Sequence, residues 1–257
     1  MSKLKSFLTK ELIDYKILLR NIPSPTILFF TLSVVCANLM ANKEFINFKY
    51  IALDCGFVFS WIMFLCMDVI CKRWGAKASV KISVFALLTN LCVCLSFFLL
   101  SKTPGNWGEF YTYQNKIVTQ SLNKTFGGSW YVVLGSATAF LISSIVNAVL
   151  NKTIGQIAEK KLKKDNFTTF ALRSYISTFI AQFSDNMIFA TIVSKIFFEW
   201  TWTQVLICSV FGAACELLCE VLFSGIGFKI LQNWEKDNVG NEYISYRKEC
   251  KAQKEEV

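Results

Sequence analysis

The sequence predicts an all-α polytopic membrane protein with about six transmembrane helices and with both termini in the cytoplasm. Three observations lead to this prediction. Of the 257 residues, 54% are hydrophobic and 18% are charged, whereas soluble domains carry about a quarter charged residues. The chain contains six long apolar segments with few or no charges. Its Lys and Arg residues gather in alternate segments between them.

Each apolar segment is long enough to cross a bilayer. Residues 21–42, 82–101 and 125–151 carry no Asp, Glu, Lys or Arg. The other three contain one or two acidic residues: 50–71 with Asp54 and Asp68, 174–194 with Asp185, and 200–228 with Glu216 and Glu220. A helix needs about 20 residues to span ~30 Å of hydrocarbon, and it satisfies its own backbone hydrogen bonds there. We therefore expect six transmembrane helices.

The basic residues give the predicted orientation. Of the 27 Lys and Arg residues, 21 lie in the N-terminal segment, in the loops after the second and fourth helices, or in the C-terminal tail. Positively charged loops stay on the cytoplasmic side, which places both termini inside the cell and the chain in the cell (plasma or inner) membrane. The net charge of +9 is then explained by an anionic lipid surface, and no nucleic-acid partner is expected.

Three parts of the chain are distinguished. Residues 1–20 place apolar side chains at helical spacing and predict an amphipathic helix, either on the cytoplasmic membrane surface or packed on the cytoplasmic loops. Residues 21–234 form the six-helix transmembrane domain. Residues 235–257 are a polar cytoplasmic tail that extends the last helix or frays. Glycines between residues 105 and 128 predict an irregular third loop.

The composition disfavours an enzyme. The chain has no histidine, which removes the usual nucleophile–base pairs, and it has no glycine-rich phosphate loop. Nearly all of the ten cysteines lie in apolar runs, where they read as small packing residues rather than as metal ligands. We expect no catalytic residue, no metal and no cofactor.

Ionisable residues inside the predicted helices are the strongest binding candidates, because such groups are costly in a bilayer and face a cavity or a partner. Asp185 lies near the middle of the fifth helix, with Gln182 on the same face. It serves either a ligand or helix packing. Glu216 and Glu220 lie four residues apart in the sixth helix, where two carboxylates repel unless one is protonated or a cation lies between them. Glu220 could instead pair with a basic loop.

Two further pairs have equally plausible structural roles. Asp68 and Lys72 are spaced for an ion pair at the end of the second helix, or for a ligand contact. Asn38 and Asn42, one turn apart in the first helix, could bridge helices or bind the edge of a base.

Three other features are weaker signals. Arg173 opens the fifth helix and could extend toward the cytoplasmic surface. Trp61 could stack on a planar ligand, although a packed or lipid-facing tryptophan is the commoner case. Ala37 and Ala41 give the first helix a face of small residues for close helix contact.

Four blocks of the sequence together resemble the queuosine precursor transporter family. This family is a branch of the vitamin-uptake-like proteins, with a fold similar to the substrate-binding subunits of energy-coupling-factor transporters. The blocks are ANLMANK (37–43), FVFSWIMFLCMDVICKRWGAKAS (57–79), LRSYISTFIAQFSDNMIF (172–189) and, more weakly, CELLCEVLFSGIGF (215–228). Matching positions are Asp68, Lys72, Trp74, Gly75, Arg173, Ser177, Asp185 and Phe189, while Glu216 stands where relatives carry a basic or acidic residue.

The chain departs from this pattern at a few positions. Relatives often carry proline near Ser224 or Gly225 and at the place of Ser60. They commonly carry an acidic residue where this chain has Asn147. These departures concern the substrate more than the fold.

The resemblance implies a transporter that imports a 7-deazaguanine (preQ0, preQ1, queuine or its nucleoside) for salvage into tRNA modification. Asp185 or Glu216 would accept the N1–H and the exocyclic amine, and the second carboxylate would meet the cationic aminomethyl group of preQ1. Gln182, Asn38 or Asn42 would bind the carbonyl, and Trp61 would stack on the ring.

Two alternatives remain open. The chain could be a vitamin-binding subunit that needs a separate ATP-driven energising module, docked on the face of Ala37 and Ala41. It could also be a membrane enzyme or assembly factor, which the lack of histidine disfavours. Besides substrate and membrane lipid, the expected partners are such an energising module or further copies of the chain.

Overall fold

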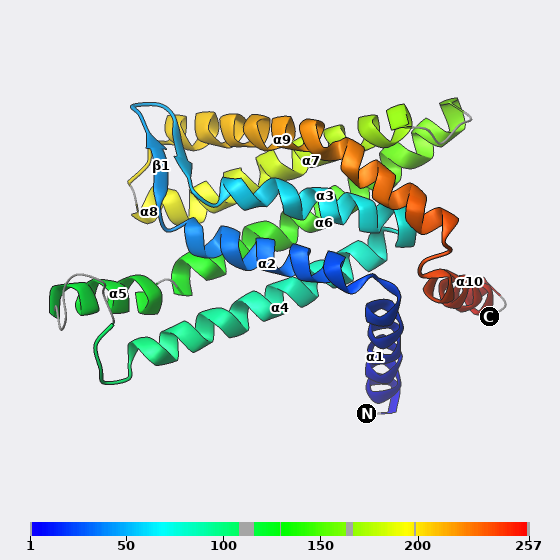
Figure 1. Cartoon of the computed structure of the whole chain (residues 1–257), viewed down its shortest axis with the longest axis horizontal. Coiled ribbons are helices and arrows are strands. Elements are labelled where there is room, and N and C mark those ends of the chain that lie inside the picture. Colours follow the sequence, from blue (N-terminus) through cyan, green and yellow to red (C-terminus); the bar gives the residue numbers. More distant parts are fainter. Residues whose placement is uncertain (1, 108–115, 129, 163–166, 198, 256–257) are drawn as a thin grey trace.

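The computed structural model describes residues 2–107, 116–128, 130–162, 167–197 and 199–255. Its helices and strands follow in this order: α1 (Ser2–Asn21), α2 (Ser24–Met40), β1 (Glu44–Asn47), β2 (Ala52–Asp54), α3 (Phe57–Trp74), α4 (Ala76–Ser101), α5 (Lys116–Gly128), α6 (Trp130–Leu162), α7 (Phe167–Phe189), the π-helix η1 (Ala190–Ser194), α8 (Lys195–Phe197), α9 (Trp202–Lys236) and α10 (Asn241–Glu255). Helices α2, α3, α4, α6, α7 and α9 occupy the six predicted ranges and pack into one bundle (Figure 1).

The prediction of an all-α polytopic fold is confirmed. Within the described residues, four helical stretches are long and apolar enough to cross a membrane: Ala76–Ser101, Val133–Ile157, Tyr175–Ser194 and Trp202–Lys236. The bent pair of α1 and α2 would add a fifth. Helix α3 has 18 residues but carries Asp68, Lys72 and Arg73. The count of six spans and their orientation therefore stay predictions.

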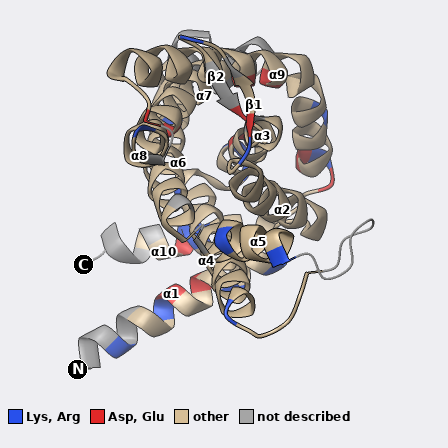
Figure 2. Ribbon diagram, turned by 90° about the vertical axis from the view of Figure 1, so that its left-hand side faces the viewer, with Lys and Arg blue, Asp and Glu red and all other residues tan. Residues whose placement is uncertain are grey.

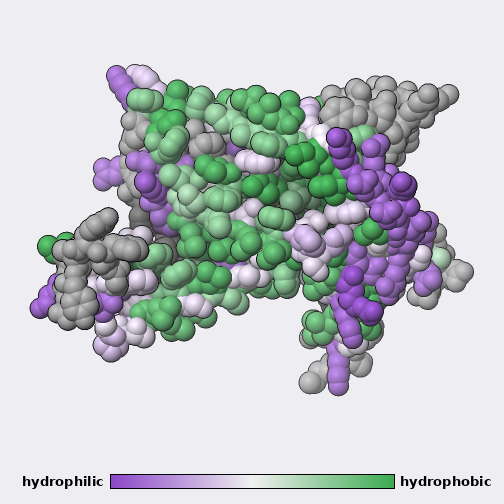
Figure 3. Space-filling model, viewed as in Figure 1, coloured by the Kyte–Doolittle hydropathy of each residue, from purple (hydrophilic) through white to green (hydrophobic). Residues whose placement is uncertain are grey.

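The surface of the bundle is that of a protein solvated by lipid. On the face seen in Figure 3, apolar side chains form a broad band across the middle of the bundle, and hydrophilic residues lie toward its two ends. Large apolar side chains of the transmembrane candidates are exposed, among them Leu28, Phe29, Leu88, Leu206 and Leu222. An apolar surface of this extent would be unstable in water, so it marks the membrane-facing zone.

The apolar core lies between α2, α3 and α4 and continues to the end of the bundle that carries both termini. Phe30, Phe64 and Ile82 are fully buried in it. Trp74 at the end of α3 lies 5.1 Å from Trp234 of α9 between ring centroids. Leu18 of α1 and Tyr243 of α10 also belong to this cluster. The two terminal helices are thus packed on the base of the bundle.

Helix α1 turns sharply away from α2, at an angle of 106°. Its buried face contains Asp14 and Leu18, and Ile22 directly after the helix is buried as well, whereas Leu8 and Leu12 are 53% and 69% exposed. If α2 crosses the membrane, a helix at this angle runs along the membrane surface. Of the two placements considered from the sequence, packing on the end of the bundle explains the buried face, and a lipid surface fits the exposed one.

Ion pairs fix α1 to the start of α4. Lys81 Nζ lies 2.5 Å from Asp14 Oδ2 and 2.6 Å from Glu11 Oε2, and Lys77 lies 3.3 Å from Glu11 Oε1. Arg247 of α10 lies 3.8 Å from Asp14. The hydrogen bond from Lys81 lowers the pKa of Glu11 below its ordinary value of 4.5. These residues, called the base network below, lie where α1 and α10 meet the bundle (Figure 2).

The second transmembrane helix begins later than predicted. Residues 44–54 form an antiparallel hairpin in which Glu44 lies opposite Asp54, and α3 begins only at Phe57. The apolar residues of the hairpin had lengthened the hydrophobic run. The correction moves Asp54 out of the helix to the end of β2. A Cβ on Gly56 would lie 2.6 Å from the backbone oxygen of Ala37, so glycine allows this turn to approach α2 closely.

Two other loop predictions are wrong. Gly127 and Gly128 do not mark an irregular loop but end helix α5, which packs on the end of α4 through stacked Phe97 and Phe126. The tail neither extends α9 nor frays, because α10 is a separate helix. Positive φ angles at Asn238 (55°) and Gly240 (75°) interrupt the helical backbone between α9 and α10.

Candidate functional site

A pocket lies near the end of the bundle that carries the hairpin. In the predicted orientation this end faces the outside of the cell. The space between its walls, including the part open to solvent, is ≈ 760 Å³. Its lining residues are Ala37, Asn38, Ala41, Asp54, Gly56, Ser60, Met63, Ser136, Phe140, Asp185, Asn186, Phe189, Ala190, Ser194, Trp200, Cys208, Ser209, Gly212 and Glu216.

Glu216 is the most buried carboxylate of the pocket, with 2% of its surface exposed. Its Oε1 accepts a hydrogen bond from the hydroxyl of Ser60 on α3, and its Oε2 accepts one of 3.4 Å from Asn186 on α7. Both donors are neutral. The carboxylate is therefore held at a junction of α3, α7 and α9 without a basic side chain.

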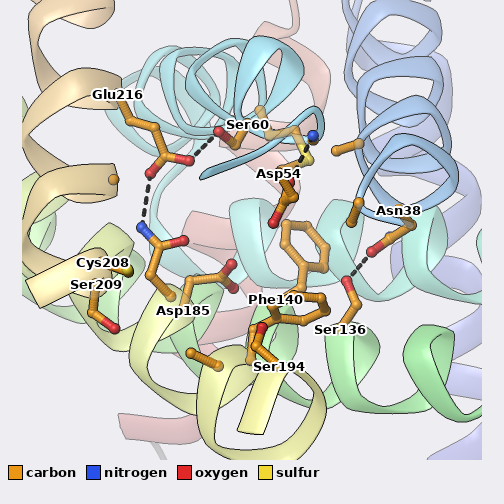
Figure 4. A pocket seen from close by; sticks show the side chains of 18 of the residues that line it. Asn38, Asp54, Ser60, Ser136, Phe140, Asp185, Ser194, Cys208, Ser209 and Glu216 are labelled. Atoms are coloured by element: carbon orange, nitrogen blue, oxygen red, sulfur yellow. Dashed lines mark hydrogen bonds between the residues drawn. The ribbon is translucent and has the colours of Figure 1, made fainter. Parts of the chain in front are cut away.

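Asp185 enters the pocket from α7. Its Oδ1 accepts a hydrogen bond of 2.7 Å from the hydroxyl of Ser143 on α6. Asp185 and Glu216 lie on the same side of the pocket, and Asn38 and Ser136 lie on the opposite side (Figure 4). Neither carboxylate forms an ion pair with a described Lys or Arg. Each keeps acceptor capacity for a ligand.

Asn38 forms the amide wall of the pocket. Its Nδ2 donates to the backbone oxygen of Val34 at 3.0 Å, and its Oδ1 accepts from the hydroxyl of Ser136 on α6. These contacts fix the orientation of the amide. Ala37 and Ala41, considered above as an outer docking face, are 8% and 7% exposed and line the pocket instead.

The π-helix η1 shapes the rim. It follows α7 directly, and its Ala190 and Ser194 line the pocket together with Phe189. A π-helix inserts an extra residue into a helical turn, and such insertions are frequent at functional sites. Phe140 and Trp200 supply further aromatic surface. The pocket therefore combines flat apolar walls with a few polar groups.

The structure brings three of the predicted residues to the pocket: Asn38, Asp185 and Glu216. Asp68 lies deeper, fully buried on α3. Its Oδ1 accepts hydrogen bonds from Asn147 (3.0 Å) and Asn151 (2.8 Å) of α6, and its Oδ2 accepts one of 3.2 Å from Thr178 of α7. These four residues are called the inner cluster. Gln182 and Glu220 are also fully buried and do not line the pocket.

The remaining predicted residues lie elsewhere. Trp61 stacks on Phe223 of α9 at 4.5 Å between ring centroids, so it packs two helices together. Asn42 lies in the turn after α2 rather than in the helix, and it donates to the backbone oxygens of Leu39 and Asn38 at the end of α2. Lys72 is half-buried at the end of α3, outside the pocket. The side chain of Arg173 lies outside the described part of the chain.

Several lining residues had no signal that singled them out. Ser60 and Asn186 hold Glu216, yet each is an ordinary polar residue in an apolar helix. Asp54 was assigned to a transmembrane helix, whereas its Oδ1 accepts from the backbone N–H of Gly56 at 2.7 Å at the pocket rim. The proximity of Asn186 to Asp185 in sequence was the one available clue.

The polar and aromatic groups of the pocket indicate the kind of ligand that it could hold. Among the described residues, no group of three His, Cys, Asp or Glu side chains could hold a metal ion. Two carboxylates supported by neutral donors suit a ligand that is rich in N–H groups or carries a positive charge. Aromatic walls suit a flat apolar body.

Comparison with known proteins places the chain in a family. Residues 54–231 match the family model described as "Putative vitamin uptake transporter". This range runs from the end of β2 into the last turns of α9 and includes most of the pocket. Neither a curated protein nor a solved structure gives a match. Because the matched range covers more than half of the chain, this multi-pass membrane protein belongs to the family of vitamin uptake transporters.

Proposed function

We propose that this chain imports a 7-deazaguanine precursor of queuosine, namely preQ0, preQ1 or queuine, across the cell membrane for tRNA modification. The observation that carries the proposal is the pairing of Asp185 and Glu216 in one aromatic-lined pocket, each hydrogen-bonded to neutral donors alone. The family match supports uptake of a small molecule. The resemblance of the sequence blocks supports the deazaguanine class.

The pocket offers complementary groups for such a base. A carboxylate can accept two hydrogen bonds, from the N1–H and the exocyclic amine of the base. Asn38 on the opposite wall offers an amide to the carbonyl edge. Phe140, Phe189 and Trp200 replace Trp61 as candidate stacking surfaces. The second carboxylate is a partner for the charged aminomethyl group of preQ1.

The family description favours a second candidate. A subunit that binds a vitamin and works only with an ATP-driven energising module would carry a similar outward pocket. The two candidates differ in what the chain does alone. Uptake of a deazaguanine by the purified protein in liposomes supports the first, and recovery of an ATPase module with the protein from its native membrane supports the second.

The deciding experiment is salvage in a bacterium that cannot make queuosine precursors and lacks its own transporter. Cells expressing this chain receive nanomolar preQ0, preQ1 or queuine, one at a time, and their tRNA is resolved on a boronate gel. A shifted tRNA band with one base, absent in cells without the chain, is the expected result and identifies the substrate. No shift with any base, in a strain able to process each one, contradicts the proposal.

A further inference from the structure

Polar side chains continue inward from the pocket along two neighbouring helices. On α6, Ser143, Asn147 and Asn151 are each separated by four residues, about one helical turn. On α7, Asp185 and Gln182 share one face, which continues to Thr178. All of these residues except Asp185 are at most 1% exposed. Two antiparallel polar stripes thus face the interior of the bundle.

Hydrogen bonds connect the two stripes at two levels of the bundle. At the pocket level Ser143 donates to Asp185, which joins α6 to α7. At the inner cluster Asn151 and Thr178 both donate to Asp68, which joins the same two helices again. The two levels are roughly 10 Å apart along α7, at about 1.5 Å per residue.

Gln182 and Asn147 lie between these two levels. Gln182 is fully buried, and neither its Nε2 nor its Oε1 has a hydrogen-bond partner among the described residues. Asn147 donates to Asp68, but its Oδ1 is likewise without a described partner. A fully buried Glu220 lies one turn below Glu216 on α9. Polar residues that serve helix packing are normally hydrogen-bonded, so these unsatisfied amides require another explanation.

We propose that Gln182 and Asn147 form an inner binding station for the transported molecule, on its way from the pocket to the cytoplasmic side. The inference rests on the proposed function and extends it to the route. An amide with a donor and an acceptor suits a planar heterocycle with an amide edge, the same edge that the pocket binds. Polar groups facing the interior of a membrane bundle mark such routes.

The first experiment tests the route independently of the substrate. Gln182→Cys is expressed in inside-out membrane vesicles and treated with a small, charged, membrane-impermeant methanethiosulfonate. Peptide mass spectrometry reads the modification at position 182 itself, so the ten native cysteines can stay. The matched control is Asn90→Cys on α4. The Asn90 amide is also buried, and its Nδ2 also lacks a partner among the described residues, but Asn90 lies outside the two polar stripes of α6 and α7.

The expected result is modification of position 182, but not of position 90, from the cytoplasmic side. Equal protection of both positions overturns the inner station. Modification of position 182 only in right-side-out vesicles also overturns it, because the residue would then belong to the floor of the outer pocket. None of these outcomes depends on which molecule is transported.

The second experiment separates binding from passage. Gln182→Leu keeps the size of the side chain and removes its amide. We expect uptake to fall by about tenfold or more while affinity in the outer pocket changes by less than about threefold. Thermal unfolding of the purified variant checks that it is folded. Wild-type uptake by Gln182→Leu, or an equal loss with Asn90→Leu, overturns the proposal. Absence of deazaguanine binding by the wild type refutes the proposed function, and the thiol experiment then decides on the station alone.

Discussion

Asp14 of the base network and Glu216 of the pocket are both buried, but the carboxylates of these two regions have different partners. Asp14 lies within 4 Å of three basic side chains, those of Lys77, Lys81 and Arg247. Asp185 and Glu216 are hydrogen-bonded only to hydroxyls and an amide. A carboxylate next to Lys has its charge balanced within the protein, so it holds helices together. One that meets only neutral donors has charge and acceptor sites left for a ligand.

Lys81→Met should have the largest effect on stability. It leaves Asp14 buried without its nearest cation, which is expected to lower the free energy of unfolding by about 3 kcal/mol. Thermal unfolding in detergent measures the change. Lys77→Met is the matched control: this side chain is 48% exposed, and its loss should cost at most about 1 kcal/mol. Equal losses for the two variants would remove the distinction between the base network and ordinary surface charges.

Asp185→Asn and Glu216→Gln should act on binding rather than on folding. Loss of a charge-assisted hydrogen bond to the ligand is worth about 1.5–3 kcal/mol, or roughly 10- to 150-fold in affinity. The boronate gel and direct binding of the deazaguanine measure the effect. Normal salvage by both variants would show that the pocket carboxylates do not bind the substrate.

Asp68→Asn should separate the inner cluster from the pocket. Asparagine replaces one carboxylate oxygen by an amide group, which cannot accept a hydrogen bond. At least one of the three donors Asn147, Asn151 and Thr178 then loses its acceptor, which should lower the free energy of unfolding by about 1–3 kcal/mol. Pocket affinity should change by no more than about twofold, because distant sites are nearly additive. A large loss of affinity with unchanged stability would place Asp68 among the ligand contacts instead.

The smallest expected effect is that of pH on α1. Lys81 lowers the pKa of Glu11 in the folded protein below its ordinary value of 4.5. The ionised carboxylate therefore stabilises the docked helix fully at pH values above 4.5. The contribution is lost as pH falls through the lower, folded-state value. The protection of α1 amides, measured as the exchange rate relative to the intrinsic rate at the same pH, should fall over this acidic range and not between neutral pH and 5. The variant Glu11→Gln should lose this pH dependence of protection, and a wild type with equal protection at all pH values would contradict the assignment.

The positions of the helices could be predicted because the charge and hydropathy of a segment indicate whether lipid or water surrounds it. Lipid excludes charged residues from long runs, so the runs reveal α4, α6, α7 and α9. The hairpin escaped prediction because residues 50–53, in its second half, are apolar and extend the run that leads into α3, while the backbone of this segment pairs as strands. Hydropathy does not distinguish these two ways of satisfying backbone groups.

The site could be predicted only in part. An acidic residue in an apolar helix stands out, which identified Asp185 and Glu216. Their partners Ser60 and Asn186 do not stand out, because serine and asparagine are tolerated in membrane helices. Helical spacing also grouped Gln182 with Asp185, although one turn of α7 separates the pocket from the level below it. A periodic pattern gives the face of a residue but not the depth at which the neighbouring helices leave space.

The π-helix η1 makes the pocket rim sensitive to the length of the chain. In an α-helix each residue turns the chain by about 100°. Removing one residue between Ala190 and Ser194 would allow a regular α-helix there and would rotate everything beyond it by about that angle. Ser194 and Trp200 would then leave the rim, whereas Asp185, before the bulge, would keep its place. Sequence alignment of this segment must therefore treat a single-residue gap as a change of binding site, not as loop variation.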